Sequence, residues 1–181
     1  MRTITTLVFL IFISCGEQKT VENKGFIELR DKLPIISTPI TFNSDDDINL
    51  KSIELVDNEL LKGLKQRNYF SAFGKIFETE NFITIIGYIP SDSGTPILVT
   101  IDKDGIEVSS HAIYETVMGD MGRYTSNFVT IDSKRIIHFT DSTLTRQINE
   151  EGDDEIPGTD ALTVTIRKYR ITDVGKIENI E

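Results

Sequence analysis

The feature that most restricts the fold is a succession of short apolar segments, separated by polar turns, that runs from Ser71 to the C-terminus. The longest of them, 161–172, alternates apolar with polar side chains, which predicts a β-strand. Segment 97–102 is followed by Lys103-Asp104-Gly105, where Asp-Gly favours a tight hairpin. We therefore predict a mainly β fold, an antiparallel meander that forms a sandwich or a partly open barrel. Further strands are expected at 75–79, 82–89, 106–111, 127–132, 135–139, 143–148 and 176–180.

One segment near the N-terminus has helical rather than strand periodicity. Gly63 weakens its centre, but the apolar residues of 52–66 recur at helical spacing, at Ile53, Val56, Leu60, Leu61 and Leu64. The sequence thus predicts one short helix, packed at one end of the β structure. The polar stretch 43–47 before it is expected to be a loop.

Composition places the chain among globular proteins and excludes several classes of function. Of its 181 residues, 39% are hydrophobic and 27% are charged, and no linker interrupts 25–181, which we expect to be a single β-rich domain. The 29 acidic and 19 basic residues give a net charge of −10, which argues against a nucleic-acid partner. A single cysteine excludes an internal disulfide and a multi-cysteine metal site. No motif indicates a cofactor.

The N-terminus has the pattern of a targeting segment. Arg2 precedes the apolar run 7–13, which is too short to span a bilayer and fits the core of a signal peptide. Ser14-Cys15-Gly16 then resembles the lipobox of bacterial lipoproteins, in which the cysteine carries diacylglycerol and becomes the first mature residue. The resemblance implies a signal peptide at 1–14, lipidation of Cys15 and a flexible, lipid-anchored tether at 15–24. The alternative is a secretory signal followed by an incidental free cysteine.

The rest of the chain resembles small uncharacterised envelope lipoproteins common in Bacteroidota. The segments that carry this resemblance are 74–110 (GKIFETENFITIIGYIPSDSGTPILVTIDKDGIEVSS) and 168–177 (KYRITDVGKI). The resemblance implies a protein held at the outer membrane or cell envelope by lipid on Cys15, with the periplasmic or surface face left open. It supplies no catalytic residues.

Two histidines are the candidates for acid–base chemistry. Ser109 and Asp102 lie close enough in sequence to His111 for a Ser–His–Asp set to be drawn, and His138 lies within a predicted strand. The chain lacks the Gly-x-Ser-x-Gly turn that exposes a nucleophilic serine. We therefore assign no catalytic residue, and an envelope hydrolase that uses one of the histidines is the alternative function.

Two acidic stretches, 45–47 and 150–155, could bind a hard cation such as calcium. The second was compared with the calcium-loop template, in which residue 153 takes the first position. Pro157 then falls at the fifth position and Val164 at the twelfth, where a bidentate glutamate is needed. We expect solvated loops and assign no metal site.

The segment 114–124 has the most unusual composition. Tyr, Met and Arg are enriched at the centres of protein interfaces, and its glycines permit backbone shapes closed to other residues. We predict a non-enzymatic binding or accessory module with an envelope protein or glycan as partner. Its candidate binding residues are Tyr114, Met118, Met121, Arg123 and Tyr124. The alternative is a loop that folds back over the core.

Overall fold

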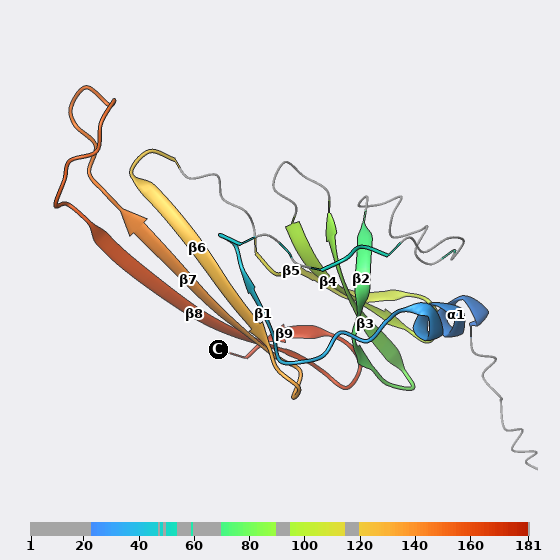
Figure 1. The fold of residues 1–181 in the computed structure, drawn as a ribbon. Helices are drawn as coiled ribbons and strands as arrows, with labels where there is room; N and C mark the ends of the chain where they lie inside the picture. Colours follow the sequence, from blue (N-terminus) through green and yellow to red (C-terminus); the bar gives the residue numbers. More distant parts are fainter. Residues whose placement is uncertain are drawn as a thin grey trace, which may run out of the picture.

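The computed structural model describes residues 23–46, 48, 50–53, 59, 70–89, 95–114 and 120–180. One antiparallel sheet has the strand order β1 (Ile40–Asn43), β6 (Arg123–Ile131), β7 (Ile136–Thr145), β8 (Ala161–Ile171) and β9 (Ile177–Asn179). The other has the order β2 (Ser71–Glu78), β3 (Phe82–Ile89), β4 (Thr95–Asp102) and β5 (Glu107–Ala112). The sheets approach each other at the C-terminal end of β8 and diverge towards its beginning (Figure 1).

Both sheets contribute to one buried core. Leu98 and Ile86 from the four-stranded sheet cluster with Val129 and Ile137 from the five-stranded sheet, and all four are fully buried. The described residues thus form an antiparallel sandwich and no closed barrel, so the predicted fold class is confirmed.

Aspartates at the ends of two strands explain the tight hairpins. The Asp102 carboxylate accepts the backbone N–H groups of Asp104 and Ile106, at 3.0 and 2.8 Å. The Asp132 carboxylate accepts those of Lys134 and Ile136, at 2.8 and 2.9 Å, in the β6–β7 turn. An aspartate that bonds to its own turn offers the chain a local reason to reverse. The two turns themselves were located from Asp104-Gly105 and from the polar residues 133–134.

The observed strands β2 and β6 each begin four residues before the predicted start, and two further differences concern whole strands. The predicted strands 135–139 and 143–148 are replaced by the single strand β7, which continues through Thr140, Asp141 and Ser142. These polar residues stay in the sheet because β7 is paired along its length with both β6 and β8. Strand β1 was not predicted, since its four residues carry too short a pattern.

The helix α1 (Lys24–Lys32) covers the outer face of the four-stranded sheet (Figure 1). Its first turn is capped by Asn23, whose Oδ1 accepts the N–H of Gly25 at 2.9 Å. Phe26 and Leu29 are fully buried, in a cluster with residues of β3 and β4 such as Ile85. The four-stranded sheet is therefore packed on both faces.

Sequence reasoning missed α1, which begins at the last residue of the expected tether. Only two of its nine residues are buried and the rest are mostly charged, so its periodicity is weak. The helix predicted at 52–66 falls largely outside the described residues and stays a prediction. The same holds for the signal peptide at 1–14, for Cys15 and for the tether up to residue 22. No helix among the described residues is long and apolar enough to cross a membrane.

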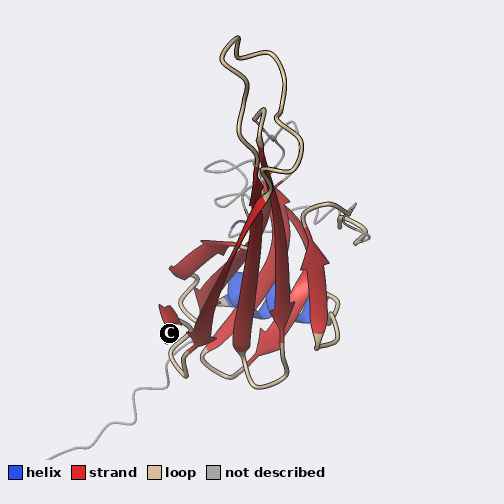
Figure 2. Cartoon of the chain, turned by 90° about the vertical axis from the view of Figure 1, so that its left-hand side faces the viewer, coloured by secondary structure: helices blue, strands red, loops and turns tan. Residues whose placement is uncertain are grey.

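The five-stranded sheet extends beyond its partner, and the two faces of this extension differ. Figure 2 shows β6, β7 and β8 rising towards the loop that joins β7 to β8. Alternation along a strand usually marks a buried apolar face. On β8 the apolar face is instead the exposed one, because the side chains of Leu162, Val164 and Ile166 are 67, 52 and 63% exposed. Arg167 lies on the opposite face of β8, which is turned towards the four-stranded sheet. There its guanidinium contacts the ring of Phe139 in the core.

Candidate functional site

A cavity of about 480 Å³ lies where the two sheets diverge. It stands at the boundary between the apolar core and the polar extension of β6–β8. Its lining comes from β5 and the residues after it, and from β6, β7 and β8: Ser110, His111, Ala112, Ile113, Tyr114, Asn127, Phe139, Asp141 and Arg167.

Three polar side chains from three adjacent strands form one side of this cavity. Asn127 on β6 lies directly opposite Asp141 on β7, and its Nδ2 donates to Asp141 Oδ1 at 2.9 Å. Arg167 on β8 donates from Nη2 to Asp141 Oδ2. The carboxylate thus accepts one hydrogen bond from each side. In the register Arg167 lies opposite Phe139, so its side chain reaches Asp141 diagonally along the sheet.

Arg167 keeps hydrogen-bonding capacity beyond its ion pair. Its guanidinium carbon lies 5.3 Å from the ring centre of Phe139, so the plane is held against the aromatic core. Its Nε is buried and has no hydrogen-bond partner among the described residues. A buried donor without a partner costs about 1–3 kcal/mol, so an acceptor reaching it would be favoured. The side chain as a whole is 42% exposed, so other parts of it reach solvent although Nε does not.

His111 faces this polar group from β5. Its ring centre lies 4.5 Å from that of Tyr169 and 5.5 Å from that of Phe139. Burial lowers the pKa of His111, and the positive charge of Arg167 lowers it further. The imidazole is therefore neutral near pH 7 and offers one donor and one acceptor.

The structure does not assemble the serine–histidine–aspartate set drawn from sequence. His111 pairs with Leu98 on β4. Asp102 lies four residues beyond Leu98 on the same strand, and its carboxylate is hydrogen-bonded to the backbone of the turn that follows. Four residues of strand span about 13 Å. Ser109 accepts the N–H of Ile177 at 3.3 Å.

His138 lies on the outer face, away from the cavity. Its Nε2 lies 3.5 Å from Asp132 Oδ2. Thr130 lies opposite His138 in the β6–β7 pair. Among the described residues, however, no serine or threonine is hydrogen-bonded to either histidine.

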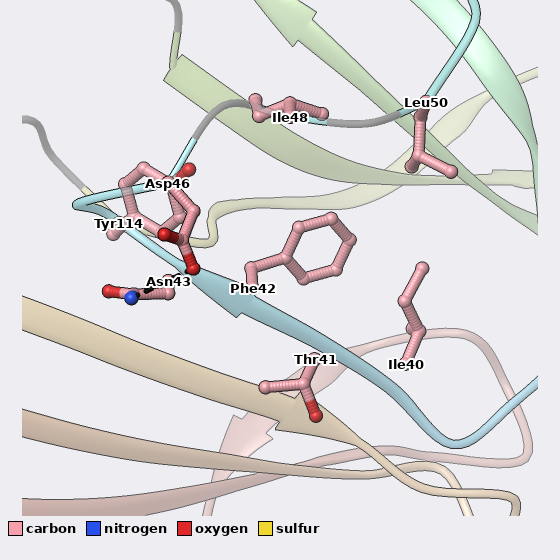
Figure 3. A pocket seen from close by; sticks show the side chains of 8 residues that line it. All are labelled: Ile40, Thr41, Phe42, Asn43, Asp46, Ile48, Leu50 and Tyr114. Carbon is pink, nitrogen blue, oxygen red and sulfur yellow. Dashed lines mark hydrogen bonds between the residues drawn. The ribbon is translucent and has the colours of Figure 1, made fainter.

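Tyr114, the first candidate binding residue, is only 7% exposed. It lies between the cavity and a second, mainly apolar hollow of about 270 Å³ lined by β1 and the residues after it, including Phe42 and Leu50. Figure 3 shows Phe42 at the centre of this hollow, with Tyr114 beside Asp46. Burial raises the pKa of Tyr114, and the charge of Asp46 adds to the effect. Tyr114 is thus a lining residue rather than a surface contact.

The other described candidates lie at the far end of β6. Arg123 and Tyr124 are its first residues, and Tyr124 lines an acidic hollow with Met121 and Glu155. Met121 is 46% exposed and Tyr124 45%. The structure therefore brings Met121 and Tyr124 together and places Tyr114 in a different cavity. Met118 lies outside the described residues.

Glu155 anchors the β7–β8 loop at this end of the sheet. The Tyr124 hydroxyl donates to its Oε1, as does the N–H of Gly122 at 2.9 Å, and Arg146 Nη1 donates to its Oε2 at 2.8 Å. The Tyr124 hydrogen bond, followed by those of Arg146 and Gly122, lowers the pKa of Glu155 to about 2. Within the described ranges, no three histidine, cysteine or acidic residues are arranged to hold a metal ion.

Sequence reasoning missed Asn127, Asp141 and Arg167 because they form no local motif. They come from three strands and meet only through the register of the sheet. One signal was present, since Asp141 interrupts what would otherwise be a β pattern. Comparison of the chain with models of known protein families, with curated proteins and with solved structures finds no match.

Proposed function

We propose that this protein is a lipid-anchored component of the bacterial envelope that acts as a non-enzymatic binding module, and that the cavity between the sheets takes a carboxylate of its ligand. The observation that carries the proposal is the unfilled donor of Arg167 beside the cavity. The anchor is supported by the apolar run 7–13 and the Ser14-Cys15 pair that follows. An envelope glycan or an envelope protein could supply the ligand.

A carboxylate matches the chemistry of the cavity best. A guanidinium presents its donors in a fixed plane that suits a planar carboxylate. Asp141 already balances part of the charge of Arg167, and the chain carries a net charge of −10, so a doubly charged phosphate would be less favoured. His111 and Tyr114 add polar groups at the wall.

The rest of the wall suits a compact ligand with an apolar face. Phe139 lines the cavity, and the ring of Tyr169 packs 5.2 Å from it, centre to centre. Aromatic rings beside a few fixed polar groups are typical of sites for small ligands. An acidic sugar and the C-terminus of a short peptide both combine a carboxylate with such a face.

Carboxylate probes test the proposal directly. Glucuronate would be compared with glucose, and D-alanyl-D-alanine with its C-terminal amide, by following the Arg167 Nε–H signal in ¹⁵N NMR spectra. We expect the charged member of at least one pair to shift this signal in a saturable way, and the responding pair identifies the source of the carboxylate. Binding of the responding probe, followed by saturation-transfer signals of the probe itself, should be lost in Arg167→Lys, whereas Arg170→Lys, on the same strand, should keep it. No response to either carboxylate at millimolar concentration would contradict the proposal.

The histidine hydrolase has less support. Neutral His111 could act as a base, but the residue next to it, Ser110, is not hydrogen-bonded to it, and Asp102 is held in a turn. The geometry therefore favours binding over acyl transfer.

A further inference from the structure

The strand β8 has an open edge for most of its length. β9 pairs with it only at Tyr169, Arg170 and Ile171, and the N–H of Ile180 reaches the carbonyl of Lys168 at 2.9 Å. Among the described residues, none pairs with this edge over 161–167.

The direction of the backbone groups at this edge follows from the pattern of the sheet. In an antiparallel strand, successive residues direct both their N–H and C=O to alternate neighbours. Because the carbonyl of Lys168 is directed towards β9, those of Leu162, Val164 and Ile166 are directed to the same side. These three residues therefore present donors and acceptors in line at the open edge.

This edge carries no proline, lysine or bulge, and its one charged side chain, Arg167, is already paired with Asp141. Proline, lysine and bulges usually protect an exposed edge. Segment 161–167 reads Ala-Leu-Thr-Val-Thr-Ile-Arg, and its register against β7 runs without a shift. Four of its residues are β-branched, and its apolar side chains are mostly exposed. Such an edge is suited to accept another strand.

We propose that β8 pairs antiparallel with β8 of a second copy of this chain, about a twofold axis at Val164. The pairing would join the two five-stranded sheets edge to edge. It places Leu162 opposite the partner's Ile166 and Val164 opposite the partner's Val164. Each of these pairs exchanges both backbone hydrogen bonds, and their apolar side chains form one continuous row.

The charges at the ends of this segment support a second copy as the occupant. Positions equally far from Val164 on its two sides face each other across the axis, so Arg167 lies opposite the partner's Ala161. Asp160, which also pairs with Arg146 of its own chain at 2.7 Å, lies opposite the partner's Lys168. Opposite charges meet and like charges do not, at both ends of the paired segment. β9 and Ile180, whose N–H donates to the carbonyl of Lys168, occupy the edge from Lys168 onwards, which limits the partner strand to the same seven residues. A twofold interface requires this kind of self-complementarity.

Cysteine cross-linking tests the axis, because Cys15 is the only native cysteine. Val164→Cys and Val174→Cys would each be introduced into the full chain carrying Cys15→Ala, purified in detergent and mildly oxidised. Val174 is a matched control, since it is 64% exposed and lies in the β8–β9 turn outside the proposed interface. Paired strands bring the two Val164 Cα atoms to about 5.5 Å, which is within the range of a disulfide.

We expect Val164→Cys to give mostly covalent dimer and Val174→Cys to give little. Sedimentation velocity on the unaltered chain should show a dimer that dissociates on dilution. Val164→Lys places two like charges on the axis and should give monomer, with circular dichroism unchanged because the side chain is exposed. Val174→Lys should remain dimeric. A monomeric unaltered chain, equal cross-linking of the two cysteine variants, or a dimer that persists in Val164→Lys would overturn the proposal.

Discussion

Asn127 and Asp141 lie directly opposite each other on β6 and β7, and the Asn127 amide donates to the Asp141 carboxylate at 2.9 Å. This contact lies at the edge of the core between the sheets, because the next pair on the same face, Val129 and Phe139, is buried. The polar pair therefore closes the core and at the same time holds the partner of Arg167. The same carboxylate therefore supports the fold and borders the proposed ligand site.

Replacing Asp141 should separate these two roles. Asp141→Asn keeps the shape of the side chain but removes the charge that neutralises Arg167. Because the arginine side chain is 42% exposed, we expect a loss of less than about 1 kcal/mol in the free energy of unfolding. Affinity for the carboxylate probe that binds should rise, since Arg167 would have no competing charge. Chemical denaturation and NMR titration measure the two effects, and Asp173→Asn, at an exposed site, is the control. Weaker binding by Asp141→Asn would show that the carboxylate positions Arg167 rather than competes for it.

His111 should make stability depend on pH. Its lowered pKa means that the folded chain favours the neutral imidazole. As the pH falls below about 6.5, the unfolded chain takes up a proton that the folded chain does not, so the free energy of unfolding should decrease until the folded-state pKa is passed. Denaturation midpoints between pH 7.5 and 5 should fall less in His111→Gln than in the unaltered chain. His138→Gln serves as the control. An unchanged pH profile in His111→Gln would rule out this histidine as the source.

The carboxyl group of Glu155 should titrate at an unusually low pH. Its pKa of about 2 has the Tyr124 hydrogen bond as its largest cause. The stabilisation is present above the ordinary glutamate pKa and is lost as the pH falls through the folded value. Tyr124→Phe should therefore raise the midpoint of the Glu155 carboxyl signal in an NMR titration. Tyr88→Phe, remote from Glu155, should not. If the midpoint stays near 2 in Tyr124→Phe, Arg146 and the Gly122 amide must account for it.

Helix α1 should contribute strongly to stability, whereas the segment before it should not. Phe26 is fully buried against the four-stranded sheet, so Phe26→Ala should cost about 3–5 kcal/mol. Deletion of 16–22, which is polar apart from Val21, should change the melting temperature little. Phe128→Ala, at a side chain that is 43% exposed, is a matched control for loss of an aromatic ring. A large loss on deletion of 16–22 would show that this segment packs against the domain.

Lipidation can be tested at Cys15 alone. Cys15→Ala removes the proposed acylation site, so cells fed a labelled fatty acid should no longer label the protein. Cys15 is the only thiol, and the conservative change Gly16→Ser next to it should preserve labelling. Label retained by Cys15→Ala would refute the lipoprotein assignment.

The sequence by itself determined the strand-and-turn order of the domain, because those signals are local. Segments 82–89 and 161–172 were located from their apolar pattern, and the turns between strands from Asp104-Gly105 and from the polar residues 133–134. Each of these features lies within a few residues along the chain. The same locality explains the two misses, since β1 and α1 carry too few apolar residues to be recognised apart from what they pack against.

Only the tertiary structure decided which face of a strand is covered and which side chains meet. Alternation along β8 defines two faces but does not say which of them is covered. The extent of the opposing sheet leaves Leu162, Val164 and Ile166 exposed, whereas Arg167 lines the cavity. Likewise, Asn127, Asp141 and Arg167 are far apart along the chain and are united by strand register. Register and sheet overlap are set by the packing of the whole domain, and no local window of sequence contains them.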